Sequence, residues 1–105
     1  MSSQLRFRPE LLNDAAEAFL WYEGRATGLG HEFLRAFYAA VAHVERSPML
    51  SRPVYSDFRR VLLRRFPYKL YYRVEEQRVV FYLLFHGARH PETPRRELRK
   101  RDEAS

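Results

Sequence analysis

The chain has 105 residues, of which 46% are hydrophobic and 15% aromatic, a composition typical of a folded protein rather than a disordered one. It contains no cysteine, which excludes disulfides and cysteine-ligated zinc. The N-terminal sequence MSSQLRFRPE lacks the apolar segment of a signal peptide, and no apolar run approaches the roughly 20 residues that cross a bilayer. We therefore expect a single domain over residues 1–105, in the cytoplasm and with no membrane partner.

The net charge of +6 comes from the second half of the chain. Residues 1–52 contain six arginines and six acidic residues, whereas residues 53–105 contain thirteen lysines or arginines against seven acidic residues. Such an excess attracts an acidic partner, which is nucleic acid, a nucleic-acid-bound complex or an acidic protein segment. A solubilising surface explains the same excess equally well, so charge leaves the partner open.

The first half of the chain predicts one strand and two helices. Residues 4–8 alternate between apolar and basic side chains, as in a short strand. Apolar residues at helical spacing predict a first helix from Pro9 to Tyr22 and a second from His31 to Arg46. The glycines of residues 24–30 separate the two helices, and they are not a phosphate loop because no Lys-Ser or Lys-Thr pair follows them. Residues 47–58 are expected to form a connecting loop.

The second half predicts three strands in close succession. Residues 59–66 and 68–75 each alternate with a period of two, which places alternate side chains on opposite faces of a sheet. Val79–Phe85 is apolar at every position, as expected of a strand covered on both faces. The charged tail, residues 94–105, is either a short helix resting on the domain or a frayed end.

These elements together predict an α+β fold with the order β-α-α-β-β-β. A helical hairpin is expected to cover one face of a small, mostly antiparallel sheet. The opposite face is expected to remain partly open, basic and aromatic, and we expect the functional surface to lie there.

Three features of the sequence are more informative in combination than separately. They are the early strand LRFRPEL, the pattern Phe66-Pro67-Tyr68-x-x-Tyr71-Tyr72-x-Val74, and the apolar strand that ends at His86 and is followed by Arg89. Together with the helical hairpin they resemble the RelE/ParE superfamily of toxins from bacterial type II toxin–antitoxin systems, over roughly residues 4–95. The resemblance implies a growth-inhibiting toxin, associated with plasmid stabilization, that forms a hetero-oligomer with an acidic or amphipathic antitoxin.

The superfamily contains two activities. RelE-like members resemble ribonucleases that cut messenger RNA on the ribosome, which requires a base, an acid and cations around one phosphate. The candidates here are Lys69, Arg65, His86 and Arg89, with His86 suited to carry a proton because its ordinary pKa lies near neutrality. However, residues 48–58 lack the glutamate that some nuclease members use, and no tyrosine follows His86.

We therefore expect the ParE-like activity, inhibition of DNA gyrase, without catalytic residues and without a cofactor. A RelE-like ribonuclease acting on the ribosome and mRNA remains an alternative, as does a non-toxic co-repressor that only binds the antitoxin. The four histidines do not form a metal-binding pattern. Antitoxin binding is common to all three alternatives, and the residues expected to contribute are Arg64, Arg65, Lys69, Arg73, Tyr71 and Arg89.

Overall fold

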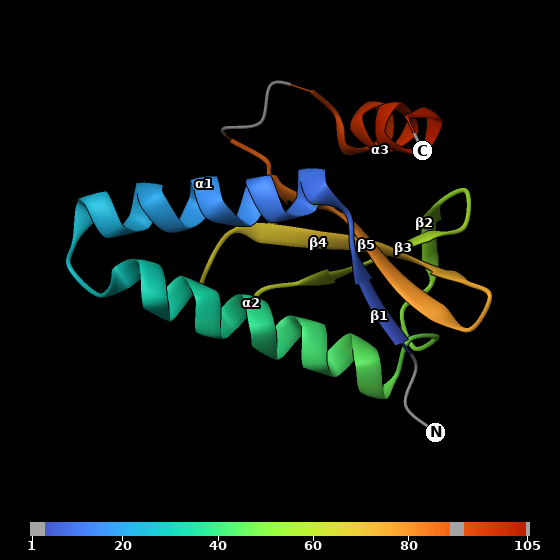
Figure 1. Cartoon of the computed structure of the whole chain (residues 1–105), viewed down its shortest axis with the longest axis horizontal. Coiled ribbons are helices and arrows are strands. Elements are labelled where there is room, and N and C mark those ends of the chain that lie inside the picture. The colour runs from blue at the N-terminus through green and yellow to red at the C-terminus, as the bar shows by residue number, and fades with distance from the viewer. Residues whose placement is uncertain (1–3, 89–91, 105) are drawn as a thin grey trace.

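The computed structural model describes residues 4–88 and 92–104, along which the chain forms five strands and three helices (Figure 1). The predicted α+β fold, with a helical hairpin packed on a mostly antiparallel sheet, is confirmed. No helix in these ranges is long and apolar enough to cross a membrane. In chain order the elements are β1 (Gln4–Phe7), α1 (Pro9–Arg25), α2 (Leu29–Arg46), β2 (Pro53–Tyr55), β3 (Phe58–Leu62), β4 (Tyr68–Glu75), β5 (Arg78–His86) and α3 (Pro94–Glu103).

The strands form one sheet in the order β1-β5-β4-β3-β2. β1 runs parallel to β5, and the other neighbouring strands pair in antiparallel fashion. β5 therefore has a neighbour on each side, and its residues 79–85 are all buried. This confirms the prediction drawn from the unbroken apolar sequence of β5.

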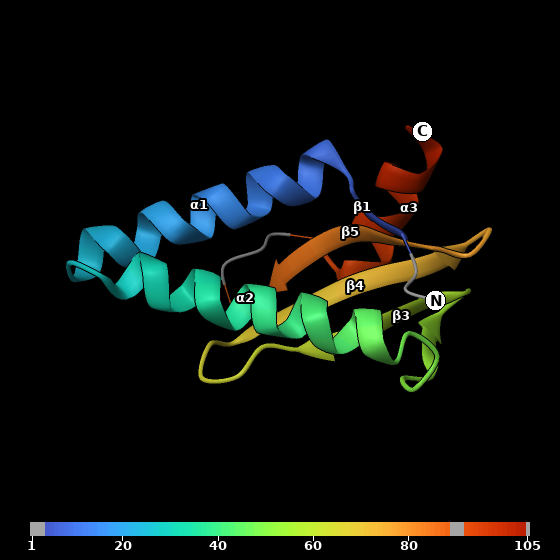
Figure 2. The same ribbon diagram turned by 60° about the horizontal axis from the view of Figure 1, so that its bottom comes forward.

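Helices α1 and α2 form an antiparallel hairpin that covers one face of the sheet (Figure 2). The core between these two layers is rich in aromatic rings. Phe33 of α2 packs against Tyr22 of α1 and against Phe66 and Tyr68 of the sheet layer, with ring centroids 5.2–5.6 Å apart. Such offset and edge-to-face contacts add to the free energy gained from burial.

The carboxylate of Glu23 fixes the turn between the two helices. It accepts hydrogen bonds from the backbone N–H groups of Gly28 and Gly30, each at 2.9 Å. These groups lie at the N-terminus of α2, where N–H groups have no partner within the helix. The hydrogen bond from the N–H of Gly28, and to a lesser extent that from Gly30, lowers the pKa of Glu23 below its ordinary value. Gly28 has a φ of 89°, a conformation that favours glycine.

A bulge in β5 sends two successive side chains to the same face of the sheet. Tyr71 pairs with Leu83 and Tyr72 with Phe81, so Tyr82 is the extra residue. Phe81 belongs to the core under the hairpin, whereas Tyr82 and Leu83 both belong to a second apolar cluster on the opposite face. The bulge therefore enlarges the apolar surface that this second face must bury.

Helix α3 covers the second face, so the prediction that this face remains open is wrong (Figure 2). Of the two alternatives for the tail, the helix is the one that forms. Leu98 is fully buried and contributes about 1.5–3 kcal/mol, but a helix of ten residues is marginal by itself. Its polar contacts must therefore contribute as well. The buried residues beneath it are Phe58, Tyr71, Val80, Tyr82, Leu83 and Phe85.

Two expectations about the sheet near β3 are also wrong. β3 ends at Leu62, and both Leu63 and Phe66 join the hairpin core rather than facing opposite sides. The predicted loop 47–58 contains strand β2, which pairs with the start of β3. The β2–β3 turn and the β3–β4 turn both contain a non-glycine residue with positive φ, namely Ser56 at 53° and Arg65 at 70°. Turns of this kind lack the glycine that usually reveals them in a sequence.

Replacing Gly30 with alanine should destabilise the hairpin. A Cβ atom there would lie 2.8 Å from both Cδ1 and the carbonyl oxygen of Phe19. A backbone carbonyl cannot yield unless α1 shifts, so we expect the free energy of unfolding to fall by about 1–3 kcal/mol. Gly24→Ala is the matched control, because its Cβ would meet nothing within 4 Å. Equal Tm values for the two variants would contradict this close helix contact.

Candidate functional site

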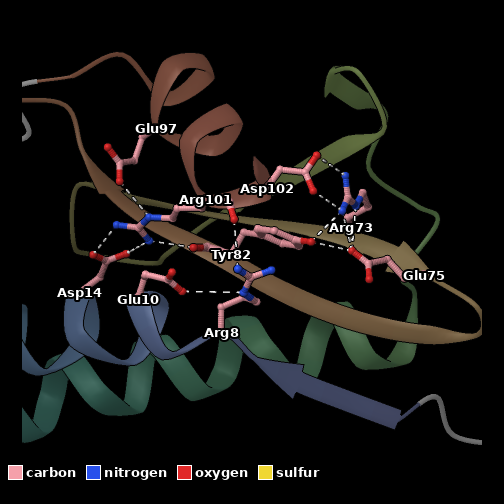
Figure 3. Close-up of polar contacts among 9 residues, drawn as sticks. All are labelled: Arg8, Glu10, Asp14, Arg73, Glu75, Tyr82, Glu97, Arg101 and Asp102. Carbon is pink, nitrogen blue, oxygen red and sulfur yellow. Dashed lines mark hydrogen bonds and ion pairs between the residues drawn. The ribbon is translucent and has the colours of Figure 1, made fainter. Parts of the chain in front are cut away.

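The polar residues beneath α3 form ion pairs that connect the two ends of the described chain (Figure 3). Arg101 of α3 donates to both carboxylate oxygens of Asp14 of α1, at 2.7 and 3.0 Å, and to Glu97 at 2.9 Å. Arg101 is only 8% exposed. Burial acts to lower its pKa, but the bonds to Asp14 and Glu97 outweigh burial and raise the pKa of Arg101 above its ordinary value.

Asp14 and Arg101 also complete the hydrogen bonding of β5. β1 pairs with β5 only as far as Phe81. Further along the same strand, the N–H of Leu84 donates to Asp14 at 3.0 Å, and the carbonyl of Tyr82 accepts from Arg101 at 2.7 Å. A buried backbone group without a partner costs about 1–3 kcal/mol. The ion pair therefore stabilises the bulged part of β5 as well as α3.

Arg73 of β4 makes a second set of ion pairs beneath α3. Its guanidinium donates to Asp102 at 2.8 and 3.1 Å, to Glu75 at 2.8 Å and to the hydroxyl of Tyr82 at 2.7 Å. The hydrogen bonds with Asp102 raise the pKa of Arg73 and lower the pKa of Asp102. The charge of Arg73 is thus neutralised within the chain.

Two of the predicted partner-binding residues therefore lie under α3. Tyr71 is 2% exposed within the second apolar cluster, and Arg73 is engaged by acidic residues of its own chain. In this arrangement α3 separates both from any partner. Arg89 lies outside the described residues.

Lys69 of β4 and His86 of β5 lie at the end of the two strands that is far from Arg73, on different faces of the sheet. Lys69 pairs with Phe85, which belongs to the cluster under α3. The ring of His86 packs against Tyr68, which belongs to the hairpin core, with centroids 4.9 Å apart. These two candidates for RNA cleavage therefore belong to opposite faces of the sheet.

Arg64 and Arg65 occupy the turn between β3 and β4. Arg65 is exposed and pairs with Glu32 of α2 at 3.0 Å. Arg64 is also exposed and lies at the border of a groove between α2 and β3. The predicted basic set is thus divided between the space under α3, the end of the sheet and this groove.

The groove between α2 and β3 has a volume of about 470 Å³. Small side chains of α2 form one wall and β3 forms the other, and Leu62 at its border is 61% exposed. Three lining residues are arginine or histidine, and none of the described lining residues is acidic. The residues that line it are Ala36, Ala39, Ala40, His43, Arg46, Val61, Leu62 and Arg64.

This groove is not among the sites predicted from the sequence, although the sequence carries a weak signal for it. Ala36, Ala39, Ala40 and His43 recur at helical spacing beside the larger residues that face the core. Alanine is also the strongest helix former, so such a stripe is easily attributed to helix stability. Within residues 4–88 and 92–104, no three His, Asp or Glu residues are grouped as they would be to hold a metal.

Comparison with known proteins agrees with this fold. Residues 5–91 match the family described as ParE toxin of type II toxin-antitoxin system, parDE. A solved structure of the chromosomal ParDE toxin–antitoxin system from P. aeruginosa is similar, with a TM-score of 0.60 and 14% identity over 80% of this chain and 95% of that chain. A double mutant of the E. coli toxin RelE in the free state has a TM-score of 0.62 and 15% identity over 99% of this chain and 97% of that chain. Among proteins of curated function, none matches the sequence.

The fold is thus that of the RelE/ParE superfamily, as the sequence motifs predicted. Because the family match covers most of the chain, the protein belongs to the ParE toxin family of type II toxin–antitoxin systems. Membership implies a cognate antitoxin as partner. The similarity to the two solved structures concerns the fold, since both identities are low.

Arg101→Met should destabilise the protein, because it leaves the carboxylate of Asp14, which is only 15% exposed, without its guanidinium partner. Removing one member of a buried ion pair costs about 3–5 kcal/mol, which chemical denaturation should report as a lower free energy of unfolding. Arg99→Met is the matched control on the exposed side of α3, with an expected change within about 0.5 kcal/mol. If both variants unfold at the same denaturant concentration, Arg101 does not hold α3 in place.

Proposed function

We propose that this chain is the toxin of a type II toxin–antitoxin module, that it inhibits DNA gyrase, and that a cognate antitoxin neutralises it. The observation that carries the proposal is the match of residues 5–91 to the ParE toxin family. ParE-like members resemble gyrase inhibitors, so this chain would act by binding a protein. Gyrase works in the cytoplasm, and we place the toxin there too.

The positions of the nuclease candidates support gyrase inhibition over RNA cleavage. A base, an acid and cations must all reach one phosphate, at hydrogen-bonding distance. Lys69 and His86 belong to opposite faces of the sheet. Arg65 is paired with Glu32, and Nδ1 of His86 accepts a hydrogen bond from the N–H of Ala88. The side chains are thus arranged as parts of the fold rather than around a shared substrate.

The charge distribution supports an acidic antitoxin. Of the residues predicted to bind it, Arg64 and Arg65 are exposed and Lys69 is partly exposed. Opposite charges across an interface accelerate association and are weakened by salt. These basic side chains at and beside the β3–β4 turn would therefore attract an acidic partner.

The purified wild-type chain should inhibit supercoiling of a relaxed plasmid by gyrase, and the antitoxin should restore supercoiling. Lys69→Ala and His86→Ala should keep this inhibition, because the proposal assigns no catalysis to either residue. A gel assay of plasmid topology measures both effects.

Primer extension on translated mRNA separates the alternatives. Unaffected gyrase, with mRNA cleavage that either substitution abolishes, would establish the ribosome-dependent nuclease instead. Normal growth on induction in a host that lacks the antitoxin would favour the non-toxic co-repressor.

A further inference from the structure

The outer edge of β3 continues past the end of its neighbour β2. β2 pairs with β3 only through Phe58 and Arg59, whereas β4 pairs with β3 as far as Leu62. In an antiparallel ladder, successive residues direct their N–H and C=O groups to opposite edges. The N–H of Leu63 donates to the carbonyl of Tyr68, at 3.0 Å, on the β4 side. Leu62 therefore directs its backbone groups outward, beyond the end of β2.

This edge borders the groove beneath α2. A chain extended alongside Leu62 would direct alternate side chains into the groove, since successive side chains of a strand point to opposite faces. The space is available because α2 presents Ala36 and Ala39 there rather than larger residues. The remaining side chains would cover that of Leu62, which is 61% exposed.

The charges around the groove indicate the chemistry of the occupant. Arg46 and Arg64 line it together with His43, and the described part of the lining contains no acidic side chain. A segment in which apolar residues alternate with acidic ones matches both the apolar walls and the basic border. Such alternation is also the pattern of a strand that is buried on one face.

We propose that an extended segment of the antitoxin adds to the sheet as a strand at the outer edge of β3, pairing with Leu62. Its apolar side chains lie in the groove beneath α2, and its acidic side chains lie against Arg46 and Arg64. In strand addition, main-chain hydrogen bonds supply affinity and the pockets for alternate side chains supply specificity. The inference rests on the proposed function, which gives this chain an antitoxin partner.

Amide hydrogen exchange tests the backbone part of this proposal. The wild-type chain is measured free and in complex with the purified protein encoded by the adjacent reading frame. Exchange at Leu62 should slow by at least about tenfold in the complex. Leu63, which already donates within the sheet, is the internal reference. A complex in which Leu62 exchanges as in the free chain would overturn strand addition, as expected if a partner helix fills the groove.

Two groups of variants test the groove by isothermal titration with the same partner. Ala39→Leu fills the groove and should raise the Kd by at least about tenfold, whereas Ala16→Leu makes the same change on the exposed side of α1 and should not. Arg46→Glu with Arg64→Glu should weaken binding and reduce its salt dependence. The control for that pair is Arg99→Glu on α3. Circular dichroism confirms that each variant is folded.

The outcomes distinguish this inference from the proposed function. If the wild-type chain forms a complex that Ala39→Leu and the double charge reversal leave intact, the groove assignment is wrong and the toxin–antitoxin pairing stands. If the wild-type chain forms no complex with the adjacent gene product, the proposed function fails and this inference fails with it.

Discussion

The ion pair between Asp14 and Arg101 is the interaction that keeps α3 over the second face of the sheet, and the rest of the structure depends on it. It joins α1 to α3 across 87 residues of sequence. The same two side chains bind the backbone of β5 at Tyr82 and Leu84, beyond the point where β1 stops pairing. The only buried residues of α3 are Leu98 and Arg101, so without this pair Leu98 and the Arg73–Asp102 ion pair would have to hold the helix over an aromatic cluster. Exposed apolar surface of that kind promotes association with other molecules.

Closure of this face changes which residues can meet a partner. Arg73 and Tyr71 were predicted to bind a partner on an open sheet face, but Arg73 instead attaches α3 and Tyr71 lies beneath it. Exposed positive charge beside apolar walls is found at the groove under α2, which Arg64 and Arg46 border. The ParE family match implies an antitoxin partner. In the arrangement that we propose, the sheet contributes an edge rather than a face to that partner.

Much of the fold could be predicted from local patterns. Alternation revealed β4, helical spacing revealed both helices of the hairpin, and the apolar run revealed the central strand β5. The features that sequence reasoning missed depend on long-range or non-apolar contacts. α3 has one leucine among charged residues, and its attachment through Asp14 cannot be seen without knowing that the two lie side by side.

The candidate site was harder to predict than the fold, because strand register decides which side chains share a face. The pairings of Tyr68 with His86 and of Lys69 with Phe85 place Lys69 and His86 on opposite faces, and nothing in the local pattern fixes that register. The groove was missed for a different reason, since small residues attract attention only when the neighbouring strand edge is known to be open.

The closed second face can be tested most directly by amide hydrogen exchange at Leu84 in the free protein. Its N–H donates to Asp14 beside the buried guanidinium of Arg101. Leu84 should exchange only when the whole protein unfolds, at the rate of core amides in β4 such as that of Leu70. Exchange at Leu84 as fast as that of an exposed loop amide would show that the Asp14–Arg101 pair does not hold this face closed.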